Sequence, residues 1–108
     1  MLRTQGQRNK LCKDCPVARV ADILGDPCSL LIMRDLIKKP HRFGDLEDAL
    51  GGMSSRTLAK VLRKLEKEGL VHRREFSHPV RFHYEVTVKG KAFQKVIDAM
   101  RAYGKHYL

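Results

Sequence analysis

Residues 54–69 read Ser-Ser-Arg-Thr-Leu-Ala-Lys-Val-Leu-Arg-Lys-Leu-Glu-Lys-Glu-Gly, and this segment decides the fold. Wound as an α-helix with 3.6 residues per turn, it places four apolar side chains on one face: Leu58, Val61, Leu62 and Leu65. The opposite face carries only cations: Arg56, Lys60, Arg63 and Lys67. Like charges three or four residues apart cost a helix roughly 0.2–0.5 kcal/mol per pair, so a bound polyanion would relieve the repulsion. A helix of this width fits the major groove of DNA.

The residues before this segment predict three more helices. The first spans about 16–24, where Pro16 suits a first helical turn and Gly25 a stop. The second, about 26–38, is apolar almost all round, which predicts a place in the middle of the core. The third spans about 42–50, and a Gly-Gly-Met turn joins it to the cationic helix. Two short helices joined by such a turn indicate a helix-turn-helix.

The residues after Gly69 predict a β-hairpin and a last helix. Apolar and polar side chains alternate from 81 to 88, which is typical of a strand with one buried face. A first strand over 70–76 and a loop over 77–80 complete a wing, whose tip carries His78 and Arg81. The last helix spans about 90–107. The predicted fold is mainly α with a small two- or three-stranded antiparallel wing, a winged helix-turn-helix.

Length and charge limit the classes of protein to consider. The 108 residues suffice for one compact domain, which we place at 14–108 after a basic N-terminal arm at 1–13. Lys and Arg number 22 and Asp and Glu 12, so the net charge is 22 − 12 = +10. This balance favours a nucleic acid or an anionic membrane as partner. Since no apolar run approaches the ~18 residues of a membrane span, we expect a cytoplasmic protein without membrane contact.

Several segments together resemble the HxlR-type regulators, small prokaryotic transcription factors related to the MarR group. The resemblance rests on segments 15–17, 30–36, 42–46, 53–58, 62–71 and 84–90, among them Arg42-Phe43-Gly44-Asp45-Leu46 and Met53-Ser54-Ser55-Arg56-Thr57-Leu58. It implies a homodimer that binds pseudo-palindromic double-stranded DNA and dimerises through its terminal helices. It also implies that Ser55, Arg56, Thr57, Lys60 and Arg63 face DNA.

We therefore predict a sequence-specific DNA-binding transcriptional regulator. The predicted DNA-binding residues are Ser54, Ser55, Arg56, Thr57, Lys60, Arg63, Lys64, His78 and Arg81. An ordinary solvated helix face is the competing interpretation, and Lys64 could simply pair with Glu68 at i, i+4. Arg56, Lys60 and Arg63 have no acidic neighbour at that spacing. A winged helix that serves as a protein–protein interaction module, without specific DNA readout, remains the alternative function.

The last helix carries an apolar stripe that reaches the chain end. We predict that it forms a dimer interface rather than packing only within its own chain, through Phe93, Val96, Ile97, Met100, Tyr103 and Tyr107.

Two cysteines near the first helix raise the possibility of redox control. Some HxlR-type regulators sense electrophiles or oxidants through a cysteine just before the first helix, the position of Cys15. A thiol at a helix N-terminus beside basic residues is favoured as the reactive thiolate, and Cys12 could resolve its sulfenic acid into a disulfide. Incidental thiols are the other interpretation, and the oxidant or small-molecule effector stays unknown.

Signatures of catalysis and of bound groups are absent from the sequence. A lone Cys-x-x-Cys at Cys12 and Cys15 lacks the further ligands that zinc needs. The chain has no phosphate-binding loop, no Gly-x-Gly-x-x-Gly and no His-Glu-x-x-His. We predict no enzyme activity, no cofactor and no metal.

Overall fold

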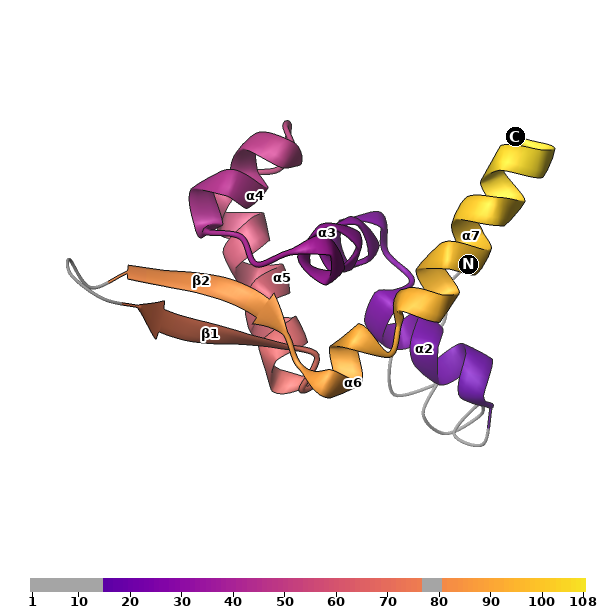
Figure 1. Cartoon of the computed structure of the whole chain (residues 1–108), viewed down its shortest axis with the longest axis horizontal. Helices are drawn as coiled ribbons and strands as arrows, with labels where there is room; N and C mark the ends of the chain where they lie inside the picture. Colours follow the sequence, from indigo (N-terminus) through magenta and orange to yellow (C-terminus); the bar gives the residue numbers. More distant parts are fainter. Residues whose placement is uncertain (1–14, 77–80) are drawn as a thin grey trace.

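The computed structural model describes residues 15–76 and 81–108. Six helices and two strands follow one another in these ranges: α2 (Pro16–Leu24), α3 (Pro27–Lys38), α4 (Phe43–Ala49), α5 (Ser55–Lys67), β1 (Val71–Phe76), β2 (Arg81–Val86), α6 (Val88–Lys91) and α7 (Gln94–Tyr107). The strands lie at one end of the molecule, and α2 and α7 lie at the other (Figure 1). This order confirms the predicted mainly helical fold with a small antiparallel wing.

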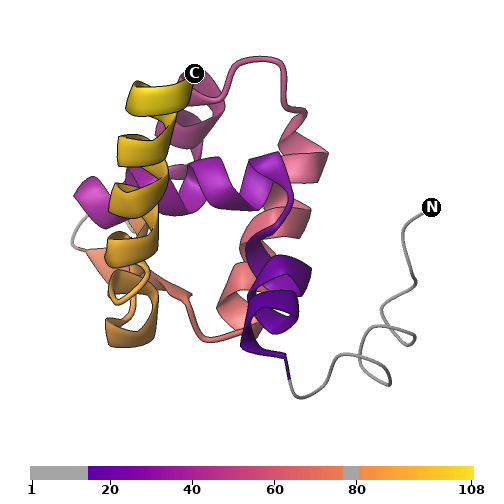
Figure 2. The ribbon, with the colours of Figure 1, turned by 90° about the vertical axis from the view of Figure 1, so that its right-hand side faces the viewer.

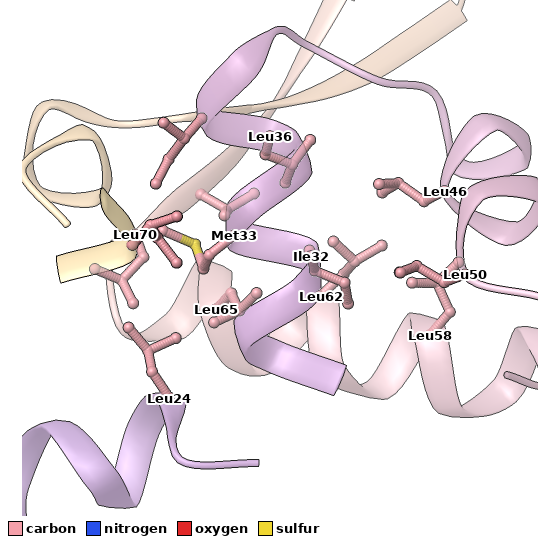
Figure 3. Close-up of a cluster of buried hydrophobic side chains, with 13 residues drawn as sticks. Leu24, Ile32, Met33, Leu36, Leu46, Leu50, Leu58, Leu62, Leu65 and Leu70 are labelled. Atoms are coloured by element: carbon pink, nitrogen blue, oxygen red, sulfur yellow. The ribbon is translucent and has the colours of Figure 1, made fainter. Parts of the chain in front are cut away.

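Helix α3 lies in the middle of the core, as its all-round apolar pattern predicted. Ile32, Met33 and Leu36 are fully buried on α3, and the other helices add side chains around them (Figure 3). The buried apolar cluster also contains Leu24 from α2, Leu46 from α4, Leu58, Leu62 and Leu65 from α5, Leu70 and Val71 at the start of the wing, and Ile97 from α7. One continuous core therefore joins all parts of the described chain.

The wing is a two-stranded antiparallel sheet extended by a single residue. Val71 pairs with Val86 at one end of the sheet and Phe76 with Arg81 at the other. His41 adds an isolated bridge to Tyr84, because the His41 amide donates to the Tyr84 carbonyl at 3.1 Å and the Tyr84 amide donates back at 2.7 Å. The segment between α3 and α4 is thereby tied to the wing.

The second strand and the last helix differ from the prediction. β2 ends at Val86 rather than at Val88, and Val88 starts α6 with 91% of its surface exposed. The physical reason is the cap at Thr87, whose hydroxyl accepts a hydrogen bond from the Gly90 amide at 3.1 Å. The alternation of apolar and polar residues therefore continues to Val88, although the strand ends at Val86.

The predicted single helix over about 90–107 is two helices, α6 and α7, which are separated at Ala92 and Phe93. Gly90 on α6 is buried against the wing, and a Cβ atom there would lie 2.1 Å from the Leu70 carbonyl oxygen. Only glycine fits so close to another backbone. This contact holds α6 against the wing. Helix α7 continues from α6 in a different direction (Figure 1) and crosses α3 (Figure 2).

Candidate nucleic-acid interface

Side-chain and glycine geometry defines both ends of α5. The Ser54 hydroxyl accepts a hydrogen bond from the Thr57 amide at 3.1 Å and donates to the Thr57 hydroxyl at 2.9 Å. Gly52 has a φ of +95° in the turn before the helix, and Gly69 has a φ of +76° after it. At the C-terminus the Leu70 amide donates to the Leu65 carbonyl at 3.0 Å, the backbone pattern that a left-handed glycine permits. The predicted helix start and stop are thus confirmed.

Helix α5 presents its cations to solvent because its leucines are buried. Leu58, Leu62 and Leu65 are almost fully buried, as predicted from their spacing. The exposed opposite face carries Arg56, Lys60, Arg63 and Lys67, which we call the basic stripe. Within residues 15–76 and 81–108, no side chain of the basic stripe forms an ion pair or a side-chain hydrogen bond. The stripe is therefore a row of uncompensated positive charge.

Two other predicted contact residues of α5 are held by neighbouring helices. The Ser55 hydroxyl donates a hydrogen bond to the carboxylate of Glu47 on α4. The Lys64 ammonium lies 3.1 Å from a carboxylate oxygen of Asp26, the N-cap residue of α3, instead of pairing with Glu68. Burial raises the pKa of Asp26, but hydrogen bonds from Ser29 and Lys64 outweigh it and hold the pKa below its ordinary value. These contacts fix the position of α5 relative to α3 and α4.

The outer face of the wing carries a charged cluster around Glu85. One oxygen of Glu85 accepts from the His72 ring at 2.7 Å and from the Arg74 guanidinium at 3.0 Å, and the other lies 3.2 Å from the His83 ring. The hydrogen bonds from His72 and Arg74 lower the pKa of Glu85 to about 2. Glu85 therefore stays ionised and offsets part of the positive charge of the described wing.

Sequence reasoning missed these wing residues. Strand register places His72 opposite Glu85 and Arg74 opposite His83, so the side chains share one face of the sheet. Arg73 points to the other face, where it pairs with Glu66 of α5 at 3.1 Å and its guanidinium lies 5.7 Å from the centre of the Phe82 ring. The alternation of charged residues along both strands was the signal that could have revealed the cluster.

The structure gives no side-chain contacts for His78 and Arg81, the two wing residues that the sequence predicted to bind DNA. His78 lies outside the described residues. Arg81 begins β2, where its backbone pairs with that of Phe76. Their predicted contacts with DNA therefore stay predictions.

The apolar residues of α7 divide between the core and the surface. Ile97 is buried in the core of its own chain and Phe93 packs partly against that core, so the stripe is not wholly free as an interface. The exposed part consists of Val96, Met100, Tyr103 and Tyr107, which we call the apolar strip. The Tyr103 and Tyr107 rings are in contact, with centroids 5.0 Å apart and ring planes tilted by 39°. Val17 and Val20 are exposed on α2. Helix α2 lies at the same end of the molecule as α7 (Figure 1).

The cysteines occupy two different environments. Cys15 is exposed at the N-cap position of α2, and its side chain makes no capping hydrogen bond. Cys28 is half-buried in the first turn of α3. Cys12 lies outside the described residues. Over the described ranges, no three side chains of the metal-binding types gather closely enough to hold an ion.

No helix within 15–76 and 81–108 combines the length and the apolar character needed to cross a membrane.

Comparison with known proteins places this geometry among DNA-binding regulators. The family described as HxlR-like helix-turn-helix matches residues 23–108. An uncharacterized HTH-type transcriptional regulator of Synechocystis, sll1512, is 39% identical over 95 residues, which cover 87% of this chain and 70% of that protein.

Solved structures agree with the sequence comparison. The reduced form of the transcriptional regulator YodB from Bacillus subtilis superposes with a TM-score of 0.76 at 32% identity, covering 86% of this chain and 93% of YodB. YodB has also been solved in a quinone-bound form. The redox regulator HypR in its oxidized form superposes with a TM-score of 0.79 at 25% identity, covering 87% of this chain and 98% of HypR.

Proposed function

The chain belongs to the HxlR-like helix-turn-helix family, and from this premise we propose that it regulates transcription by binding pseudo-palindromic double-stranded DNA as a homodimer. The observation that carries the proposal is the basic stripe. It is exposed, it is formed by the second helix of the helix-turn-helix, and its four cations have no ion-pair partner among the described residues. A prokaryotic regulator of this kind would work in the cytoplasm, where the DNA lies.

The side chains of the basic stripe suit the two kinds of DNA contact, contacts with base edges and contacts with phosphates. The arginines Arg56 and Arg63 offer planar donor forks that match a guanine edge, and each good bidentate contact is worth about 1–3 kcal/mol of discrimination. Lys60 and Lys67 offer compact charges that suit phosphates. Ser54, Ser55 and Thr57 lie at the helix N-terminus, where hydroxyls reach a phosphate or a base edge. Lys64, His78 and Arg81, which lie outside the basic stripe, would add further contacts with DNA.

We propose that the apolar strip of α7, with Val17 and Val20 of α2, forms the dimer interface. Four large apolar side chains exposed along one side of a helix form a patch that a monomer rarely leaves uncovered. A two-fold axis at this end would set two copies of α5 about one DNA turn apart, roughly 34–36 Å. Such spacing corresponds to two half-sites of a pseudo-palindrome.

We further propose that Cys15 makes the regulator responsive to oxidants. Names of two structural relatives refer to redox regulation and to a bound quinone, and Cys15 is exposed on this chain. A peroxide would oxidise the Cys15 thiol to a sulfenic acid and leave as water. The Cys12 thiol would then attack the sulfenic sulfur, forming a disulfide and releasing a second water.

Loss of the stripe arginines tests DNA binding. In the Arg56→Ala/Arg63→Ala variant we expect at least ten-fold weaker binding to DNA selected from a random library, because each arginine would lose its paired hydrogen bonds to a guanine edge. Fluorescence anisotropy measures the affinity. Lys95→Ala/Lys105→Ala removes the same charge from α7 and should bind within a few-fold of the parent chain. Unchanged affinity in the arginine variant would support a protein–protein module instead.

Charge placed in the apolar strip tests the dimer. Sedimentation equilibrium should give a dimer for the parent chain and at least ten-fold weaker association for Tyr103→Glu, because the new carboxylate must be desolvated at the interface. Ala102→Glu introduces the same charge on an exposed position outside the strip and should remain dimeric. A monomeric parent chain would refute the interface.

Mild peroxide treatment tests the thiol proposal. Mass spectrometry should find a Cys12–Cys15 disulfide, seen as the loss of two hydrogens, in the parent chain and in Cys28→Ser, but not in Cys15→Ser. If Cys15 still alkylates fully after the treatment, the chain does not sense oxidants through this residue.

A further inference from the structure

Helix α6 lies where the end of α5, the wing and the start of α7 meet (Figure 1). The chain after α5 offers α6 and its N-cap residue, Thr87, three successive backbone carbonyls. The Lys89 ammonium donates to the Glu68 carbonyl at 2.8 Å. The Thr87 hydroxyl donates to the Gly69 carbonyl at 2.6 Å, and the Thr87 amide donates to the Leu70 carbonyl at 3.0 Å. The turn at the C-terminal end of α5 is therefore bound to α6 residue by residue.

A second lysine ties α6 to α3. The Lys91 ammonium donates to the carbonyl of Ile37, in the last turn of α3, at 3.2 Å. The C-terminal end of a helix carries partial negative charge and carbonyls without intrahelical partners, so an ammonium group is favoured there. Both lysines are exposed, so each contact alone is modest, and they act together with the Thr87 hydroxyl and the close packing of Gly90. One short helix thus holds the ends of both α5 and α3.

Backbone hydrogen bonds continue from α6 into α7. The Ala92 amide donates to the Val88 carbonyl at 3.1 Å, and the Phe93 amide donates to the Gly90 carbonyl at 3.0 Å. The Ile97 amide then donates to the Phe93 carbonyl at 3.1 Å. The change of direction between the two helices therefore lies in bonded residues, and the direction of α7 follows from how α6 is held.

We propose that α6 is a rigid joint between the basic stripe and α7, and that Thr87 and Lys89 are positioning residues that determine which half-site spacing the dimer accepts. The inference rests on the proposed function, in which α7 joins two copies and each basic stripe binds one half-site. Inserting one base pair moves a half-site by about 3.4 Å along the DNA and rotates it by roughly 35°. A joint that holds α5 at a fixed angle to α7 would penalise such a change, although neither residue needs to touch DNA.

A distance measurement on the free chain tests the joint without DNA. Nitroxide labels at Lys60→Cys on α5 and Ala102→Cys on α7, in a chain whose native cysteines are replaced by serine, report the intrachain distance by pulsed electron paramagnetic resonance after dilution with unlabelled chain. Adding Thr87→Val/Lys89→Met removes the hydroxyl and the ammonium with little change in side-chain size. The distance distribution should become about twice as wide, because the freed junction acts as a hinge. A distribution as narrow as that of the parent chain would overturn the joint, whether or not the chain binds DNA.

DNA with altered spacing tests the consequence for recognition. For the parent chain, one base pair inserted between the half-sites of DNA selected from a random library should weaken binding about ten-fold or more, and in Thr87→Val/Lys89→Met less than about three-fold. Fluorescence anisotropy gives both ratios. Affinity for a single half-site should be equal in the two chains, because the basic stripe is unchanged. A merely destabilised fold would weaken binding to both DNAs alike and leave the ratio as it was.

Conservative variants separate position from charge. Thr87→Ser/Lys89→Arg keeps a hydroxyl and a cationic donor and should retain the ratio of the parent chain, as should Lys95→Met, which removes one exposed charge from α7. Circular dichroism verifies folding, and Lys89→Met alone, which leaves the Thr87 cap intact, should lower the ratio in the same direction.

Two results distinguish the joint from the function on which it rests. A dimeric, DNA-binding parent chain whose Thr87→Val/Lys89→Met variant keeps the spacing ratio, or an equal loss of the ratio in Lys95→Met, would refute the joint alone. A parent chain that neither dimerises nor binds DNA would refute the proposed function and with it the role in spacing.

Discussion

The packing of α5 on α3 supports every other part of the structure. Leu58, Leu62 and Leu65 are buried against a central helix whose own Ile32 and Met33 are inaccessible to solvent. Removing one such leucine side chain typically costs about 2–5 kcal/mol, a large share of the stability of a domain this size. Burial on one side forces the other side of α5 outward. The same contact that stabilises the core therefore keeps four like charges exposed in a row.

Polar contacts add to the apolar packing that positions α5. Asp26 holds Lys64, and Glu47 holds Ser55, so α3 and α4 each bind one polar side chain of α5. Asp26 neutralises Lys64, which is not part of the basic stripe, and Glu47 binds an uncharged hydroxyl, so the four cations of the stripe have no ion-pair partner among the described residues. On the wing, Glu85 plays a similar part for His72 and Arg74. The cations of α5 that lack an ion-pair partner among the described residues thus lie together on one face of that helix.

The sequence predicted those features that depend on local pattern. The length, the caps and the buried face of α5 could all be predicted, because Ser54, the apolar spacing and Gly69 lie within one segment. The central position of α3 followed from its all-round apolar character. The HxlR-type resemblance agrees with the family match over residues 23–108.

Features that depend on distant contacts could not be predicted in this way. Gly90 of α6 packs against the carbonyl of Leu70, twenty positions earlier, and the residues next to Gly90 predict neither this contact nor the break at Ala92 and Phe93. Ile97 and Met100 share a side of the predicted helix, yet only the tertiary structure buries the first and exposes the second. The partner of Lys64 is likewise Asp26, 38 residues away, rather than the local Glu68.

The most direct measurement of the central claim is a structure of the chain bound to DNA selected from a random library. The account predicts α5 in a major groove, with nitrogen atoms of Arg56, Lys60 and Arg63 within hydrogen-bond distance of bases or phosphates, about 2.7–3.2 Å, while Leu58, Leu62 and Leu65 remain buried on α3. A complex in which DNA lies against α2 and α7, with the basic stripe still facing solvent, would contradict it.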